Sequence, residues 1–137
     1  MVESLFVAEN IAKIKNILSL ELAEKKNLER PEDEVLSFAC YENEYYVGGI
    51  VGKIEFATAF IDLLGVSKKY RAKGIGKKLL RHFENECLNK KVEKIYLHTQ
   101  DFQALPFYLK HGYKVFAKLE NVPFKGTVRY YLIKSLF

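Results

Sequence analysis

The stretch LLGVSKKYRAKGIGKKLL, residues 63–80, decides the fold of the chain. An apolar run ending at Val66 predicts a buried strand, and the apolar spacing from Ile75 onward predicts an amphipathic helix. Between them lies a short basic turn that contains Gly74 and Gly76. Free backbone N–H groups and the positive end of a helix dipole meet at such a turn, and both attract anions. The stretch therefore predicts a binding site for a phosphorylated ligand.

Two phosphate-binding patterns do not fit this turn. A P-loop requires Ser or Thr after Gly76-Lys77, and the dinucleotide fingerprint requires a third glycine where Leu79 stands. What remains is Arg71-x-x-Gly74-x-Gly76 between a strand and a helix. This spacing resembles motif A of the GNAT superfamily, the acyl-CoA-dependent N-acyltransferases. The resemblance implies that the turn holds the pyrophosphate of CoA.

Positive charge is concentrated around the same turn. Residues 68–81 contain no acidic side chain, although the chain has 17 Asp and Glu, and their basic residues are Lys68, Lys69, Arg71, Lys73, Lys77, Lys78 and Arg81. A basic run alone is most often a solvated helix face. Because this run coincides with the glycine turn, we favour an anion site.

Length and composition are typical of one soluble domain. The chain has 137 residues, 49% hydrophobic and 28% charged, so it can bury a core without metals or disulfides. We expect one domain spanning residues 1–137. The net charge of +5 allows nucleic acid, an anionic membrane or a polyphosphate ligand as partner.

Cys40 and Cys87 fit no disulfide or metal pattern, so we expect reduced thiols and no metal site. The sequence contains neither a signal-peptide pattern nor a long apolar run, and we expect a cytoplasmic protein.

The pattern of apolar residues along the chain predicts an α/β fold. We expect helices at residues 10–27, 75–88 and 104–110, and strands at residues 4–8, 35–41, 45–56, 58–66, 92–99, 113–119 and 127–134. The apolar side of the first helix is expected to cover the sheet. The glycines of strand 45–56 indicate a bulge or a close backbone approach. A helical crossover makes strand 92–99 parallel to strand 58–66, which we expect to be central.

This order resembles the GNAT core, with one N-terminal helix where the family often has two. The resemblance implies a three-layer α/β fold, a mixed and mostly antiparallel sheet, and a central parallel pair splayed for CoA. Acetyl-CoA is then the co-substrate, and a backbone N–H at Val66 contacts its thioester carbonyl. The implied cofactor-binding residues are Leu64, Val66, Arg71, Ala72, Lys73, Gly74, Ile75, Gly76, Lys77, Asp101, Gln103 and Tyr108. Asp101 stands where many relatives carry Asn, and Gln103 could make that contact instead.

A second motif, FQALPFYLKHGY at residues 102–113, supports the resemblance. In the family an Ala opens this helix and a Tyr four residues later lies beside the sulfur of acetyl-CoA. Tyr108 matches that position, which implies that it is the general acid for the departing thiolate. The alternative is a tyrosine that only packs its ring on the core.

A base must take a proton from the attacking amine, and the sequence leaves its identity open. Asp62 and Glu55 are the candidates on strands that should face the acceptor, and His98 ends the next strand. Each could equally be an ordinary strand-end polar residue.

The resemblance implies an N-acetyltransferase that acts on a primary amine by direct attack in a ternary complex, because no cysteine is placed as an acyl carrier. The alternative is a CoA sensor without turnover or a basic nucleic-acid-binding module of the same fold. Nucleic acid is disfavoured because no basic strand is interleaved with aromatic residues. We expect a small-molecule or peptide amine as acceptor and no membrane partner, and a homodimer stays open.

Overall fold

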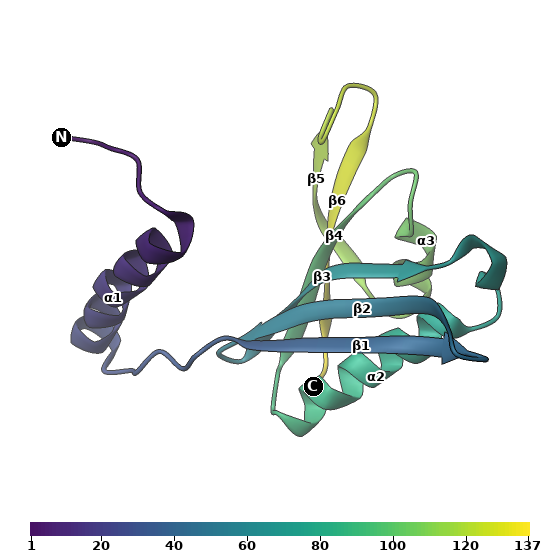
Figure 1. The fold of residues 1–137 in the computed structure, drawn as a ribbon, viewed down its shortest axis with the longest axis horizontal. Helices are drawn as coiled ribbons and strands as arrows, with labels where there is room; N and C mark the ends of the chain where they lie inside the picture. The colour runs from purple at the N-terminus through teal and green to yellow at the C-terminus, as the bar shows by residue number, and fades with distance from the viewer. The chain divides into compact units, whose positions relative to one another are not determined.

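Six strands form one sheet in the order β1-β2-β3-β4-β6-β5 in the computed structural model, which describes residues 1–137 (Figure 1). The strands are β1 (Glu34–Glu42), β2 (Tyr45–Glu55), β3 (Thr58–Val66), β4 (Lys94–Gln100), β5 (Lys114–Glu120) and β6 (Val128–Ser135). Only β3 and β4 are parallel, and every other neighbouring pair is antiparallel. The predicted mixed α/β fold, with a mostly antiparallel sheet and a central parallel pair, is confirmed.

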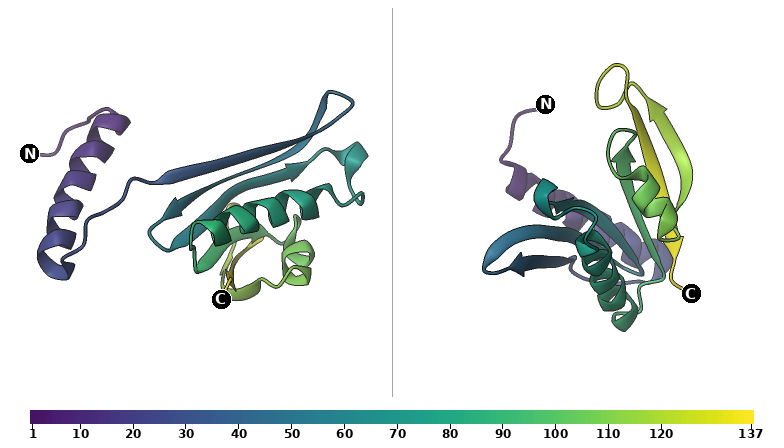
Figure 2. Two further views of the ribbon diagram at one scale, coloured as in Figure 1. Left: turned by 90° about the horizontal axis from the view of Figure 1, so that it is seen from below. Right: turned by 90° about the vertical axis from the view of Figure 1, so that its right-hand side faces the viewer.

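The helix that follows β3, α2 (Ile75–Asn89), packs on one face of β1, β2 and β3 (Figure 2). Its buried side consists of the five residues that the spacing predicted, Ile75, Leu79, Leu80, Phe83 and Cys87. They meet the inward side chains of the strands, among them Ile50, Ile61 and Leu97, in one hydrophobic core. A short helix, α3 (Leu105–Lys110), adds Tyr108 to this core.

Two glycines of β2 let the backbone and α2 approach closely, as the sequence indicated. A Cβ on Gly52 would lie 2.6 Å from Cζ of Phe83 and 2.5 Å from the carbonyl oxygen of Phe60. A Cβ on Gly48 would lie 2.8 Å from the carbonyl oxygen of Gly65. Real side chains do not tolerate such contacts, so a larger residue at either position would push the helix or β3 away.

A β-bulge in β3 redirects its side chains. Gly52 pairs with Ile61 and Val51 pairs with Leu63, so Asp62 is the extra residue. Ile61 is buried, whereas Leu63 is 66% exposed and Leu64 again packs on the core. The bulge therefore switches the inward positions from odd to even numbers along the strand.

Residues Met1–Glu32 and Asp33–Phe137 form two compact units. The first unit holds α1 (Val7–Lys26), which ends next to Asn27, as expected, and Asn27 is its C-cap in the left-handed conformation. The predicted strand at residues 4–8 is wrong. Asn10 N–H donates to the carbonyl of Phe6 at 2.9 Å, so the helix begins at Val7, and all six strands of the sheet come from the second unit.

The expected burial of the first helix is also contradicted. None of its residues is buried, and Ile11, Ile14 and Ile17 are 46%, 46% and 64% exposed. The buried hydrophobic residues all lie between Leu36 and Leu132, where α2 and α3 cover the inner face of the sheet. The single domain over residues 1–137 stays a prediction. None of the helices combines the length and apolarity that a membrane span needs.

Candidate active site

The glycine turn joins β3 to α2 and leaves the start of the helix open. Gly74 is the N-cap, with φ of 80°, and no side chain caps the helix. The first helical hydrogen bond runs from the N–H of Lys78 to the carbonyl of Gly74 at 3.0 Å. The N–H groups of Ile75, Gly76 and Lys77 therefore have no acceptor inside the helix, and an anion could accept from them.

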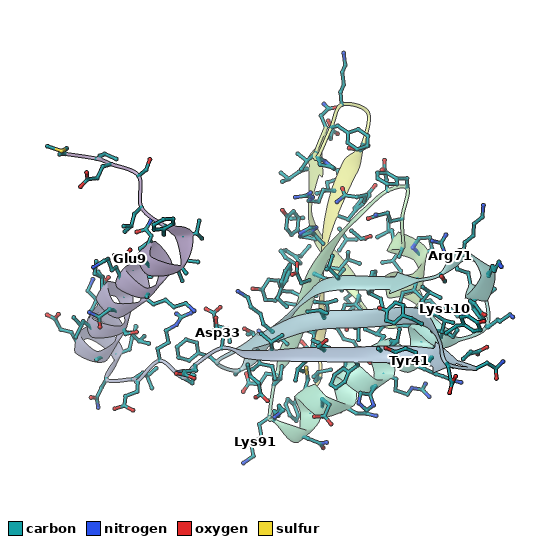
Figure 3. The ribbon with its side chains drawn as sticks, viewed as in Figure 1. Glu9, Asp33, Tyr41, Arg71, Lys91 and Lys110 are labelled. Atoms are coloured by element: carbon teal, nitrogen blue, oxygen red, sulfur yellow. The ribbon has the colours of Figure 1, made fainter.

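Backbone hydrogen bonds hold the turn in place. Ser67 N–H donates to the carbonyl of Val47 at 2.8 Å, and Tyr70 N–H donates to that of Ser67 at 2.9 Å. The side chain of Arg71, labelled in Figure 3, donates from Nε to the carbonyl of Val66 at 3.1 Å. Lys73 Nζ lies 5.3 Å from the centroid of the Tyr70 ring. The turn thus has a defined shape before any ligand binds.

The parallel strands β3 and β4 pair over only three residues each. Their ladder consists of Thr58 with Lys94, Ala59 with Ile95, and Phe60 with Tyr96. Beyond Phe60 and Tyr96 the strands run apart, and the right-hand view of Figure 2 shows the two groups of strands diverging. The backbone of β3 from Ile61 to Val66 consequently has no ladder partner on the β4 side, which leaves room for an extended ligand.

Tyr108 lies on α3, beside the start of α2. Its side chain is 5% exposed, and its ring packs edge-on against Phe107 at 5.2 Å and Tyr113 at 5.6 Å. Burial raises the pKa of Tyr108 to about 12. The hydroxyl is therefore protonated at neutral pH and able to donate a hydrogen bond or a proton.

A groove of about 470 Å³ lies on the face of the sheet opposite α2. Its lining residues come from β1, β2, β3, β4 and β6, and those that carry polar or aromatic side chains are Lys53, Glu55, Phe60, Asp62, Tyr96, His98 and Tyr131. Phe60 and Tyr96 are the last residues of the parallel ladder, so the groove reaches the point where β3 and β4 separate.

His98 faces this groove from β4. Its ring centroid lies 5.9 Å from that of Phe60 and 5.6 Å from that of Tyr131, and its Nδ1 is buried without a hydrogen-bond partner. Desolvation and then the positive charge of Arg129 lower the pKa of His98, while Asp62 raises it. The imidazole is therefore neutral at neutral pH and can accept a proton.

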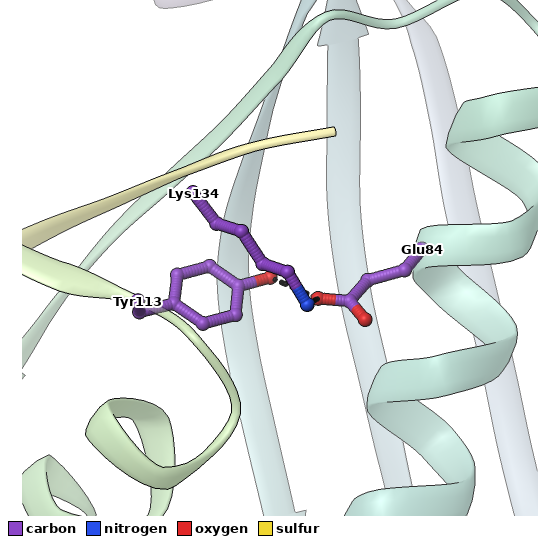
Figure 4. A network of polar contacts seen from close by, with 3 residues as sticks. All are labelled: Glu84, Tyr113 and Lys134. Carbon is purple, nitrogen blue, oxygen red and sulfur yellow. Dashed lines mark hydrogen bonds and ion pairs between the residues drawn. The ribbon is translucent and has the colours of Figure 1, made fainter. Parts of the chain in front are cut away.

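A second hollow, of about 400 Å³, lies between α2, α3 and the end of β6 and is lined by Lys77, Arg81, His111 and Lys134. Below it, Glu84 Oε2 accepts hydrogen bonds from Tyr113 Oη at 2.9 Å and from Lys134 Nζ at 3.0 Å (Figure 4). Desolvation and the neighbouring lysines lower the pKa of His111, against a raising effect of Glu84. Basic side chains thus continue from the glycine turn into the first half of α2, with Lys77, Lys78 and Arg81.

Comparison with known proteins gives the family. A family model described as "Acetyltransferase (GNAT) family" matches residues 3–113. The chain belongs to the GNAT acetyltransferase family. It is therefore an acetyltransferase with acetyl-CoA as co-substrate, as the sequence predicted.

The names of two relatives indicate different acceptors. A blasticidin-S acetyltransferase of Streptomyces morookaense is 32% identical over 113 residues, which cover 78% of this chain and 79% of the relative. N-alpha-acetyltransferase 50 of Danio rerio is 31% identical over 93 residues, covering 63% of this chain and 55% of that protein.

Solved acetyltransferase structures share the fold. An acetyltransferase from Bacillus cereus superposes with a TM-score of 0.85, at 27% identity, over 99% of this chain and 97% of that one. A putative streptothricin acetyltransferase from Bacillus anthracis, solved in complex with acetyl coenzyme A, has a TM-score of 0.67 at 24% identity and covers 78% of this chain and 64% of that one.

The predicted cofactor residues of this acetyltransferase come from two segments that meet. Leu64 to Lys77 belong to β3, the turn and α2, while Asp101, Gln103 and Tyr108 belong to the segment from β4 to α3. A Cβ on Gly76 would lie 3.4 Å from the Phe107 ring, so α2 and α3 touch at their starts. Both segments follow the carboxyl ends of the parallel strands, where α/β folds bind ligands. The individual contacts with the cofactor stay predictions.

The structure brings the two carboxylate candidates and His98 together. Asp62, Glu55 and His98 all line the groove, although the sequence singled out the two carboxylates, and not His98, as base candidates. The signal that identifies it is the register, because Phe60 pairs with Tyr96 and the side chains two residues further along share their face. Asp62 and His98 are those two residues.

Proposed function

We propose that this protein transfers the acetyl group of acetyl-CoA to a primary amine by direct attack in a ternary complex. The observation that carries the proposal is the separation of β3 and β4 beyond Phe60 and Tyr96. The opening has the basic turn and Tyr108 on the side of α2, and the groove with Asp62 and His98 on the other face. A thioester placed in the opening could be reached from both.

The residues of the turn bind the cofactor in this proposal. The N–H groups of Ile75, Gly76 and Lys77 donate to the pyrophosphate, and the surrounding lysines supply positive charge. The unpaired backbone of β3 near Leu64 and Val66 hydrogen-bonds the pantetheine arm, and the N–H of Val66 polarises the thioester carbonyl. Asp101 and Gln103 follow β4 and contact the cofactor from the other strand.

The groove prepares the amine. An ammonium group gives one proton to the His98 ring, which is neutral at neutral pH, while Asp62 stabilises the resulting imidazolium. The neutral nitrogen attacks the carbonyl carbon, the carbon–sulfur bond breaks, and the nitrogen loses its second proton to solvent, as does the His98 imidazolium afterwards. Tyr108 donates its proton toward the departing thiolate and regains one from solvent. Glu55 is the last residue of β2 and lies further along the groove. Of the two carboxylates it is therefore the less favourable candidate for the base.

The direct route is supported by the state of the cysteines. Cys87 is fully buried, and burial followed by the nearby Glu84 and Glu86 raises its pKa to about 12. Such a thiol is not a nucleophile at neutral pH. Cys40 packs partly buried against the same core.

Initial rates of CoA release with acetyl-CoA and a panel of amines test the proposal. We expect amine-dependent CoA release with a stoichiometric amount of N-acetyl product. Double-reciprocal plots of the initial rates should give intersecting lines when both substrates are varied. Parallel lines would indicate an acyl-enzyme and contradict the ternary complex. If the protein binds CoA but releases none from acetyl-CoA with any amine, it would be a CoA sensor and not an enzyme.

A further inference from the structure

Five aromatic rings form a continuous row on the sheet face that carries the groove. Neighbouring ring centroids are 5.1 Å apart for Tyr96 and Phe60, 5.9 Å for Phe60 and His98, 5.6 Å for His98 and Tyr131, and 6.2 Å for Tyr131 and Phe116. The row crosses β3, β4, β6 and β5. Ring faces of this kind attract ammonium groups and also pack well against methylene chains.

The two carboxylates of the groove are separated along the direction of the strands. Asp62 lies two residues beyond the last parallel pair, where the strands open. Glu55 pairs with Thr58, which is four residues before Asp62 on the same strand. At about 3.3 Å per residue the two backbone positions are roughly 13 Å apart. Lys53 is the one basic residue of the lining, so the groove carries a net negative charge while its histidine is neutral.

The two faces of the sheet therefore differ in charge although the whole protein is positive by 5. Basic side chains gather around the turn and in the first half of α2, where an anionic cofactor would lie. The opposite face offers two carboxylates and ring faces to the acceptor. An anionic acceptor would be repelled there, whereas a positively charged acceptor would be attracted.

From this arrangement we infer that the acceptor is a diamine or polyamine, with its reactive nitrogen between Asp62 and His98 and a second ammonium group on Glu55. The inference rests on the proposed acetyl transfer. Only one nitrogen has to lose its proton for attack, so the second keeps its charge and binds the Glu55 carboxylate. A carboxylate accepts several hydrogen bonds, so a ligand can share Glu55 with its neighbours in the protein. The methylene chain between the nitrogens lies on the rings of Phe60 and Tyr96.

A matched pair of amines tests the second charge. Hexamethylenediamine and n-hexylamine have the same six-carbon chain and differ in one terminal ammonium group, so their kcat/KM values at saturating acetyl-CoA can be compared directly. We expect a preference of about tenfold for the diamine, the size of one charge-assisted hydrogen bond at a partly exposed site. The preference should shrink as salt is added, because the contact is ionic.

Glu55→Gln is the decisive variant because it keeps the shape of the side chain and removes its charge. The preference for the diamine should fall to about twofold, which remains because the diamine has two reactive ends. Glu44→Gln removes an exposed carboxylate in the turn between β1 and β2, at the opposite end of β2 from Glu55, and should keep the tenfold preference. A thermal melt of each variant shows that the fold is kept.

The outcomes separate this inference from the proposed function. Equal acetylation of both amines by the unaltered protein, or an unchanged preference in Glu55→Gln, overturns the inference and leaves the acetyl transfer intact. If no amine of the panel supports CoA release, the proposed function itself fails.

Discussion

Phe60 of β3 and Tyr96 of β4 form the last pair of the parallel ladder, and their ring centroids lie 5.1 Å apart. Asp62 and His98 lie two residues further along their strands on the same face, where the strands are already separated. The Asp62 carboxylate raises the pKa of His98 against the effects of burial and Arg129. The end of the ladder therefore fixes both the opening between the strands and the groups that face it.

The glycine turn can be tested by its backbone. Gly74 has φ of 80°, a conformation that a β-branched residue adopts only at a cost of about 1–2 kcal/mol. We expect Gly74→Val to distort the turn and lower the affinity for CoA at least tenfold in calorimetric titration. Gly126→Val is the matched control, since Gly126 has φ of 88° in the loop between β5 and β6. Equal affinities in the two variants would show that the turn does not bind CoA.

The polar network on Glu84 should stabilise the fold measurably. The side chains of Glu84 and Lys134 are 14% and 26% exposed, and Tyr113 donates to the same carboxylate oxygen. Lys134→Met leaves that carboxylate without its cation, and we expect a loss of about 2 kcal/mol in urea unfolding. The effect should be smaller in a Glu84→Gln background, because no charge is then left unpaired. Additive losses would mean that the pair is not coupled.

Much of the second unit could be predicted from the sequence because its apolar residues follow strand and helix periods. The five buried positions of α2 and the full span of β3 are confirmed. The strand at residues 4–8 failed, because a short apolar run fits a helix as well as a strand. The bulge at Asp62 could not be located, since the other residues of 59–66 are apolar or glycine and show no alternation that would reveal a shift between the two faces. His98 was considered but could not be singled out, because its position depends on the register of β4 against β3.

The pKa of His98 gives a direct test of the groove. It lies below the usual value of 6.5, and removing Asp62 removes the one influence that raises it. We therefore expect Asp62→Asn to lower the pKa of His98 further in an NMR titration of the ring protons. Glu44→Gln, in the turn between β1 and β2, should leave it unchanged. A higher pKa in Asp62→Asn would contradict the arrangement of the two side chains.

The same shifts predict how stability depends on pH. The pKa values of His98 and His111 are both lowered in the folded protein, so the unfolded chain binds more protons as the pH falls through 6.5. Stability should consequently be higher at about pH 8 than at about pH 5, and the difference should shrink in His98→Gln. Urea unfolding midpoints at a series of pH values measure this. A difference that His98→Gln leaves unchanged would assign the pH dependence to other groups.

Tyr108 and Tyr113 are neighbouring buried tyrosines whose hydroxyls should have different roles. Burial raises the pKa of Tyr108 to about 12, and no acidic group contributes to that shift, whereas Tyr113 donates to Glu84. If Tyr108 protonates the thiolate, Tyr108→Phe should lower kcat about a hundredfold and leave CoA affinity nearly unchanged, because the ring packing is kept. An acyl donor with a more acidic leaving thiol should reduce that loss. Tyr113→Phe should instead lower stability by about 1 kcal/mol and keep turnover. Full turnover by Tyr108→Phe, with chemistry rate-limiting, would reduce Tyr108 to a core residue.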